Sequence, residues 1–96
     1  MAAGYVIAEI DVTDREAYSD YVAAVTPVVE RFRGEFLVRG GSAEAVEGAA
    51  QGARIVLIRF PSYEAARAWY FSPDYAEPKA MRRAASSSVQ IIAEGV

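Results

Sequence analysis

The 96-residue sequence contains no cysteine and no histidine. Without cysteine the chain has neither disulfide bonds nor a thiol nucleophile. Without histidine it lacks the commonest general base and the commonest metal ligand, which excludes a Ser-His-Asp triad and histidine-ligated zinc or haem. The carboxylates show no metal-ligand spacing, and no serine lies in a G-x-S-x-G motif. We therefore expect no metal and no other cofactor.

Basic residues are also scarce, because nine arginines and one lysine are scattered along a chain of net charge −3. Nucleic-acid binding needs basic patches that neutralise phosphate, so this balance argues against a nucleic-acid partner. No apolar run reaches the length of about 18 residues that a membrane-spanning helix needs, and no signal-peptide pattern opens the chain. We expect no membrane association and a cytoplasmic location.

The residues that are present suit one domain over residues 1–96. A composition of 53% hydrophobic and 24% charged residues is typical of a globular protein. A chain of this size buries only about 60–65% of its unfolded surface, so its own core provides marginal stability. Help from a partner chain is therefore plausible.

Strand and helix signals follow one another in the order β-α-β-β-α-β. Short apolar or alternating runs predict strands at residues 5–12, 35–39, 54–60 and 89–94, with a ragged strand at 43–47 and a linker at 86–88. Ser62 and Ser72 each precede a helical segment in the second half, and Pro73 suits a first helical position. The second of these segments should run to about residue 85.

The first helix has its own start and stop signals. Thr13 and Glu16 match a capping box, so we expect Thr13 to be the N-cap. Pro27 should kink or break the helix near Thr26, since it removes a backbone hydrogen bond. Gly34 suits the position that follows the helix end.

This order predicts an α+β, ferredoxin-like fold, with both helical regions on one face of a four-stranded antiparallel sheet. The first and third strands would be central. We expect these two strands to run parallel to each other, which would bring Glu9 close to Arg59. We interpret Glu9 and Arg59 as a structural ion pair rather than a catalytic pair.

The other face of the sheet would then be bare. The wholly apolar set on the first strand should face the helices: Val6, Ala8, Ile10 and Val12. Large apolar residues remain on the bare face: Tyr5, Ile7, Ile55 and Leu57. A patch of several hundred Å² usually marks an interface, so we expect two sheets to pack face to face in a homodimer. The alternative is a monomer with a partly apolar sheet.

Several pieces of the sequence together resemble the domain-of-unknown-function 1330 family, within the dimeric α/β-barrel, ferredoxin-like superfamily. The combination is YVIAEIDVTD, then FLVRGG and EG, then RIVLIRFPSYEAARAWYFSPDY, and a last strand ending in EGV. The resemblance covers nearly the whole chain. One departure is Arg33-Gly34, where relatives usually have a glycine pair at the end of the first helix.

The resemblance implies a ferredoxin-like protomer and a homodimer with packed sheets, but no established activity. Superfamily relatives include cofactor-free monooxygenases, muconolactone-type isomerases and haem-binding enzymes. Roles that use a histidine cannot be carried over to this chain. A fold alone does not define a function.

Aromatic residues and one arginine are the main candidates for a ligand site. Trp69, Tyr70 and Tyr75 cluster at the junction of two helical segments, either as core packing, as is also expected of Phe71, or as a pocket wall. Arg39 precedes a glycine pair and either holds a carboxylate or enolate-like oxygen, or pairs with a nearby glutamate, Glu47.

The remaining candidates have sufficient structural explanations. Glu47, which flanks the Gly/Ala loop with Arg54, is a weak candidate for a general base if burial raises its pKa. Arg82 and Arg83 suit the C-terminal end of a helix dipole. Ser72 is a helix cap rather than a nucleophile.

Two hypotheses for function follow. The first is a small homodimeric protein that binds or transforms a partly apolar organic acid without a cofactor, in a pocket near Tyr21, Arg39, Trp69, Tyr70 and Tyr75. The second is a non-catalytic structural or regulatory dimer. A cavity lined by arginine and aromatic groups favours the first hypothesis, whereas solid packing favours the second.

Overall fold

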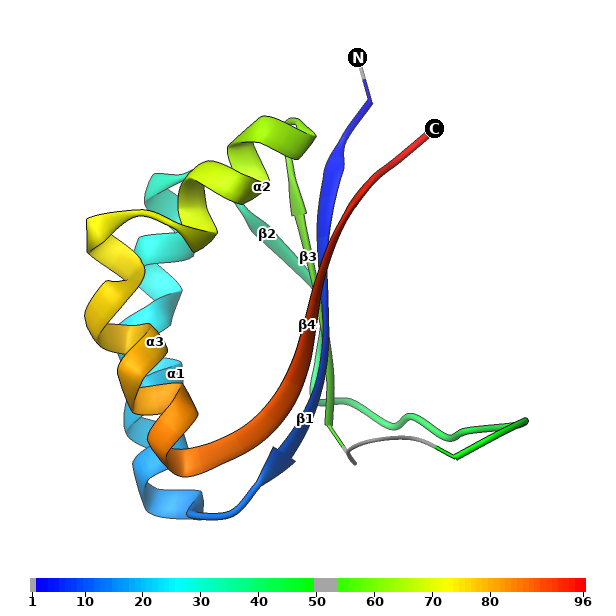
Figure 1. The fold of residues 1–96 in the computed structure, drawn as a ribbon, viewed down its shortest axis with the longest axis vertical. Helices are drawn as coiled ribbons and strands as arrows, with labels where there is room; N and C mark the ends of the chain where they lie inside the picture. Colours follow the sequence, from blue (N-terminus) through cyan, green and yellow to red (C-terminus); the bar gives the residue numbers. More distant parts are fainter. Residues whose placement is uncertain (1, 50–53) are drawn as a thin grey trace.

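The structure is a computed structural model that describes residues 2–49 and 54–96. Within these residues the elements follow one another in the predicted order, with the second helical region divided in two (Figure 1). They are β1 (Gly4–Val12), α1 (Arg15–Arg31), β2 (Glu35–Arg39), β3 (Arg54–Phe60), α2 (Tyr63–Tyr70), α3 (Pro73–Ala85) and β4 (Ser86–Glu94). The predicted α+β, ferredoxin-like class is confirmed.

The four strands form one sheet in the order β2-β3-β1-β4, and each pair of neighbours is antiparallel. The expectation that β1 and β3 run parallel is wrong. The helix after β1 returns the chain so that β2 runs in the same direction as β1, and β3, which follows β2 without a helix between them, runs in the opposite direction. Arg59 therefore lies opposite Tyr5, and Glu9 lies opposite Ile55. The predicted Glu9–Arg59 pair does not form, and Arg59 instead contacts Glu35 at 3.1 Å.

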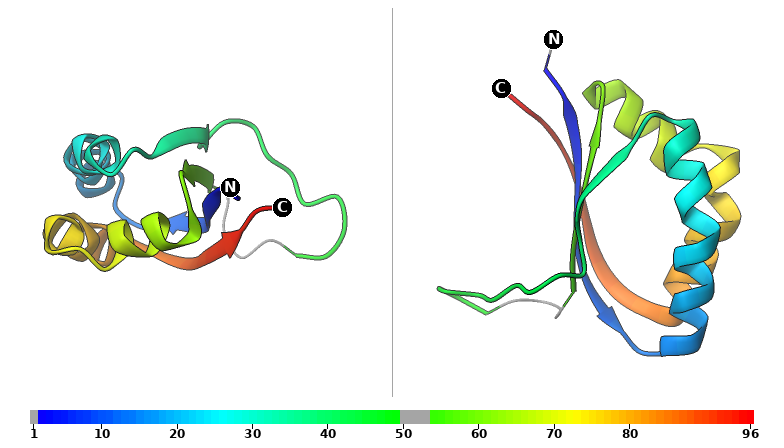
Figure 2. Two further views of the ribbon diagram at one scale, coloured as in Figure 1. Left: turned by 90° about the horizontal axis from the view of Figure 1, so that it is seen from above. Right: turned by 180° about the vertical axis from the view of Figure 1, so that it is seen from behind.

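All three helices cover the same face of the sheet, and the other face carries no element of the chain described (Figures 1 and 2). The core lies between these layers. Val6, Ala8 and Ile10 of β1 are buried against the helices, as the alternation predicted, while Tyr5 and Ile7 are only partly buried on the open face.

The first helix begins one residue later than the capping box predicted. Asp14 is the N-cap, and its carboxylate accepts a hydrogen bond from the Ala17 amide at 3.1 Å. The Thr13 amide already donates a hydrogen bond to the Ala85 carbonyl at 2.9 Å, so it does not need the Glu16 side chain as an acceptor. Pro27 lies inside α1 without ending it.

The end of α1 is a Schellman motif. The Arg33 amide donates to the Glu30 carbonyl and the Gly34 amide to the Val29 carbonyl, at 3.0 and 2.9 Å. Arg33, rather than Gly34, adopts the left-handed conformation, with φ of 63°. The predicted role of Gly34 is therefore shifted by one residue. Gly34 is required for a different reason, because a Cβ there would overlap Val29 and Phe60.

Two further boundaries differ from the sequence predictions. Residues 43–47 form no strand but an exposed part of the connection after β2, which extends beyond the open face of the sheet (Figure 2). Residues 86–88 are the first part of β4 rather than a linker, since Ser86 and Ser88 pair with Val12 and Ile10 of β1. The long β1 supplies the backbone partners that these serines need.

Among the described helices, from α1 to α3, none is long and apolar enough to cross a membrane.

Candidate ligand site between helices and sheet

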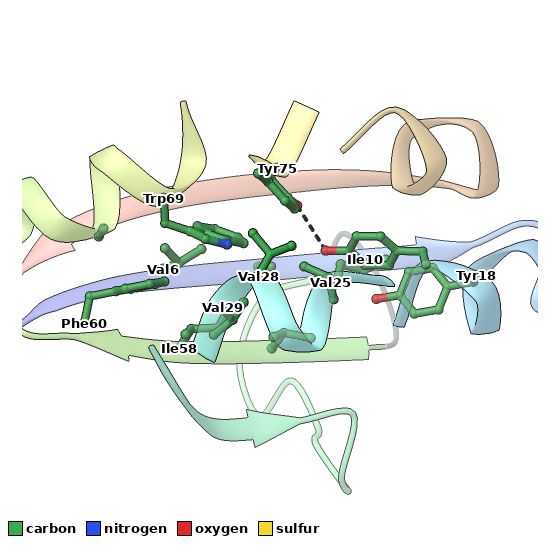
Figure 3. Packing of buried hydrophobic residues seen from close by; sticks show 14 of the residues in the cluster. Val6, Ile10, Tyr18, Val25, Val28, Val29, Ile58, Phe60, Trp69 and Tyr75 are labelled. Atoms are coloured by element: carbon green, nitrogen blue, oxygen red, sulfur yellow. Dashed lines mark hydrogen bonds between the residues drawn. The ribbon is translucent and has the colours of Figure 1, made fainter. Parts of the chain in front are cut away.

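Three predicted site residues meet in the interior. Trp69 of α2 and Tyr75 of α3 stack with ring centroids 4.2 Å apart, and the Tyr75 hydroxyl lies 3.0 Å from the Tyr21 hydroxyl of α1 (Figure 3). Trp69 is 1% and Tyr75 0% exposed, so both fill the core. Ser62 and Ser72 cap α2 and α3 as predicted and so position the two rings.

Burial raises the pKa of both Tyr21 and Tyr75, and the proximity of the two hydroxyls raises that of Tyr21 further. Both phenols are therefore neutral near pH 7. One hydroxyl donates to the other, which leaves one O–H free to donate elsewhere. The pair can stabilise a developing negative charge on a ligand oxygen, but it cannot act as a ready base.

Tyr70 and Phe71 lie apart from this interior. The Lys79 ammonium lies 4.2 Å from the centroid of the Tyr70 ring, and Phe71 is exposed at the C-cap of α2. Phe71 is therefore not a core residue, contrary to the packing role expected for it. The rings of Tyr70 and Tyr75 are 5.7 Å apart, so Tyr70 borders the cluster without lining its cavity.

Arg39 points to the helix side of the sheet because β2 contains a bulge. The register shifts between Phe36 and Val38, so Arg39 lies opposite Val56, whose side chain faces the core. An unbroken alternation would have turned Arg39 to the open face. One guanidinium nitrogen donates to the Thr26 hydroxyl at 2.6 Å and to the Val22 carbonyl at 3.3 Å. Arg39 thus joins β2 to α1 in the turn that precedes Pro27.

Arg54 comes from the start of β3 and lies on the same side of the sheet. Its guanidinium lies 5.2 Å from the centroid of the Tyr18 ring, and a side chain at Gly40 would overlap it. Gly40 has φ of 74°, so glycine meets both the conformational and the steric demand. Burial, and then the nearby Arg54 charge, lower the pKa of Arg39. The two arginines therefore form a cationic pair at one end of the interior.

A small cavity lies between these arginines and the aromatic cluster, with a volume of about 20 Å³. Its walls come from all four strands, α1 and α2, and include Tyr18, Tyr21, Arg39, Arg54, Trp69 and Gln90. A space of this size holds about one water molecule. Tyr75 and Tyr70 do not line it, so three of the five predicted site residues share the cavity.

Two of the polar atoms around this space are unpaired donors. Arg54 Nε and Trp69 Nε1 are buried and have no hydrogen-bond partner in the part of the chain described. Neither arginine of the pair forms an ion pair within residues 2–49 and 54–96. Buried donors almost always have acceptors, so this interior is suited to a group rich in acceptor oxygens.

Two predictions that involve Glu47 are wrong: that it pairs with Arg39, and that burial makes it a general base. Glu47 lies exposed in the connection after β2 and contacts neither Arg39 nor Arg54 among the ion pairs found in the described residues. The burial that would make it a general base is absent. Arg83 is exposed near the end of α3, as a dipole-compensating residue would be, whereas Arg82 is buried.

Sequence reasoning missed Tyr18, Gln90 and the burial of Arg82. Tyr18 could have been found from its spacing of three from Tyr21, which places both rings on one face of α1. Gln90 could have been found by extending the alternation of β4, since it lies opposite Ala8. No pattern in the sequence distinguishes Arg82 from Arg83.

The model of the family described as Domain of unknown function (DUF1330) matches residues 3–96. The chain belongs to this family. The resemblance inferred from the sequence motifs is therefore confirmed. No curated protein matches the chain.

Solved structures of similar fold include proteins of unknown function and one enzyme. A protein of unknown function from Rhodopseudomonas palustris has a TM-score of 0.79 at 20% identity, over 99% of this chain and 83% of its own. A dimeric ferredoxin-like protein of unknown function from Thermobifida fusca has a TM-score of 0.65 at 13% identity, covering 99% and 92%. A cofactor-independent oxygenase from Streptomyces nogalater has a TM-score of 0.63 at 11% identity, covering 97% and 92%. At these identities the similarity shows the fold alone.

Proposed function

We propose that this protein is a homodimer in which each protomer binds a small, partly apolar organic acid between the helices and the sheet. The observation that supports this function is the set of unpaired buried donors around the cavity, with two arginines and no carboxylate partner. A carboxylate supplies the acceptors that such donors lack.

The acidic group of the ligand would lie at the arginine pair. One guanidinium nitrogen of Arg39 is already hydrogen-bonded to α1, so Arg39 contributes a positive charge that is held in a fixed position. Arg54 retains an unpaired Nε and is held between Gly40 and the Tyr18 ring. Arg54 is therefore the main carboxylate-binding group, and Arg39 supports it. This assignment extends the role that the sequence suggested for Arg39 alone.

The apolar part of the ligand would lie against Trp69 and Val25, towards the Tyr21–Tyr75 hydroxyl pair. Any reaction there is cofactor-free proton transfer, or oxidation of an activated substrate with molecular oxygen as the electron acceptor, in which the neutral phenols stabilise an enolate-like oxygen. The similar fold of a cofactor-independent oxygenase supports this chemistry as a class, without defining a substrate.

Ligand entry requires movement. Pockets that bind drug-sized ligands have volumes of about 300 Å³ or more, whereas this cavity measures about 20 Å³. Tyr18 and Arg54 lie at the edge of the core, next to the connection between β2 and β3, and are the side chains whose displacement would enlarge the space. The bound form is then a minor conformation of the free protein that the ligand selects.

The homodimer would form through the open face of the sheet. Large apolar side chains cover this face in part: Tyr5, Ile7, Val38, Ile55, Leu57, Val89 and Ile91. The connection after β2 projects beyond the same face, and Val46 within it is 87% exposed (Figure 1). A second copy packed on the sheet would cover these side chains and lie within reach of this connection. The similar fold of a dimeric ferredoxin-like protein from Thermobifida fusca supports a homodimer, without defining which face pairs.

The second candidate function is a non-catalytic structural or regulatory dimer. The close stacking of Trp69 on Tyr75 and the small cavity favour it, because they leave no open pocket for a ligand between helices and sheet.

A ligand screen separates the two functions. Aromatic and aliphatic monocarboxylic acids are tested by thermal shift and then by calorimetry, with Arg54→Met and Arg39→Ala as variants. Arg15→Met is the matched control, because Arg15 is exposed at the start of α1. We expect Arg54→Met to weaken acid binding by about 10- to 100-fold, the value of a charge-assisted hydrogen bond, and Arg15→Met to leave it unchanged. If no acid stabilises the wild type, the ligand-binding function is wrong and the structural dimer remains.

A further inference from the structure

A second cationic region lies at the same end of the sheet as Arg54 but along its β4 edge, where α3 ends and β4 begins (Figure 1). It is an open cleft of about 470 Å³, and we call it the Arg82 cleft. It is lined by Tyr70, Arg82, Arg83, Ser86, Ser87, Ser88 and Gln90. Arg39 and Arg54 are not among these residues, and Gln90 alone also lines the cavity of the proposed ligand site.

Arg82 is the unusual member of this cleft. Its residue exposure is 3%, and it is the one charged residue in the buried core of the described chain. Its Nε and Nη1 atoms have no hydrogen-bond partner among the described residues, and it forms no ion pair there. Residues 50–53 contain no aspartate or glutamate that could pair with it. A buried guanidinium without an acceptor is unfavourable unless an anion supplies the missing oxygens.

Two further cationic side chains lie near Arg82. Arg83 lines the cleft, and Lys79 lies one turn earlier on α3. Burial, and then the charges of Arg82 and Arg83, lower the pKa of Lys79. Asp74, at the other end of α3, is already paired with Arg31 at 3.6 Å. Both charged side chains that line the cleft are therefore cationic, and neither forms an ion pair within the described chain.

The other lining groups can donate hydrogen bonds. Gln90 donates from Nε2 to the Ser88 hydroxyl at 3.1 Å, so the Ser88 proton remains free to donate outwards. Ser86 instead donates to the Arg82 carbonyl at 2.6 Å and closes the end of α3. Register places Ser86, Ser88 and Gln90 opposite the buried Val12, Ile10 and Ala8, on the helix side of β4.

The geometry points to a second binding site, in which the Arg82 cleft holds a hydrophilic oxyanion such as a phosphate group. Arg82 binds the anion from the buried end, Arg83 from the exposed end, and the Ser88 hydroxyl donates from the strand. The polar lining and open shape suit a hydrated, multiply charged group, in contrast to the enclosed and largely apolar cavity beside Arg54. The proposal does not depend on the function proposed above.

Phosphate titrations of the full chain test this site. Melting temperature and calorimetric binding are measured with inorganic phosphate and with succinate, at an ionic strength held constant with chloride. We expect phosphate to raise the melting temperature of the wild type beyond the effect of chloride. Succinate tests whether a carboxylate can replace phosphate: comparable binding identifies a general oxyanion site, and weaker binding identifies a phosphate site.

Two variants assign the effect to the cleft. Arg82→Met should melt at a higher temperature than the wild type without phosphate, because it removes an unpaired buried charge. Its affinity for phosphate should also fall by about 10- to 100-fold, which corresponds to the loss of one charge-assisted hydrogen bond. Arg83→Gln changes an exposed residue and should weaken binding by about 2- to 5-fold.

Arg15→Met serves as the control for a general loss of positive charge. The proposal is overturned if phosphate acts no better than chloride, or if Arg82→Met keeps the phosphate response. If Arg82→Met does not fold, an unchanged affinity in Arg83→Gln overturns it in the same way.

Discussion

The proposed dimer depends on side chains that the protomer leaves uncovered, and Ile91 is a direct test. This residue lies on the open face, on the edge strand β4 opposite Ile7 of the central strand β1, and is 47% exposed in the protomer. Full burial of an isoleucine contributes about 1.5–3 kcal/mol, so covering the remaining half contributes about 0.7–1.4 kcal/mol. A two-fold interface contains the residue twice, which doubles the contribution to about 1.4–2.8 kcal/mol.

Ile91→Lys removes this contribution and places two ammonium groups in the interface. We expect the dissociation constant of the dimer to rise by at least about 10- to 100-fold, with the cost of burying the charge in addition. The fold of the protomer should persist, since Ile91 is not part of the buried core. The assay is light scattering after size exclusion, or sedimentation velocity, over a dilution series.

The matched control is Ala23→Lys, which places the same charge on the exposed face of α1. It should leave the mass and the dissociation constant unchanged. The reasoning is refuted if the wild type is monomeric at micromolar concentration. It is also refuted if Ile91→Lys remains as dimeric as the Ala23→Lys control.

Further predictions concern backbone conformation and pH. Arg33→Gly should stabilise the protein by about 0.5–1 kcal/mol in urea unfolding, because the left-handed conformation at this position is unfavourable for arginine; a destabilised variant would show that the arginine side chain contributes more than this. Gly40→Ala should destabilise it by about 1–2 kcal/mol and weaken acid binding, since the new methyl group displaces the Arg54 guanidinium. Burial raises the pKa of Tyr21 and Tyr75 above the ordinary value of 10.0, so above pH 10 the unfolded chain releases these protons first and stability falls by up to about 1.4 kcal/mol per pH unit for each tyrosine. Tyr75→Phe should reduce that slope in urea titrations at pH 9, 10 and 11, and a full tyrosinate absorbance from the native protein at pH 10 would contradict the predicted burial.

The sequence by itself determined the class of fold and most of its elements. The apolar alternation along β1 identified which face meets the helices, and Val6, Ala8 and Ile10 are buried as it required. The serines at 62 and 72 marked the starts of α2 and α3, because capping is a local interaction between a side chain and amides three residues away. The same local chemistry, read together along the chain, was sufficient to recognise the family.

The tertiary structure decided where local signals compete with distant partners. The Ala85 carbonyl takes the Thr13 amide, so Asp14 becomes the cap of α1. Pairing with β1 extends β4 back to Ser86, although serines carry no strand signal. Both outcomes depend on backbone groups far away in the sequence, which no local pattern contains.

The candidate sites show the same division. Aromatic and arginine residues could be selected from the sequence, but their directions could not. A one-residue bulge in β2 turns Arg39 towards α1, and the antiparallel course of β3 separates Arg59 from Glu9. Arg82 and Arg83 are neighbours of identical type, yet one is buried and the other exposed. Sequence sets which chemical groups are available, whereas packing of the helices on the sheet sets which of them lose water and lack a partner.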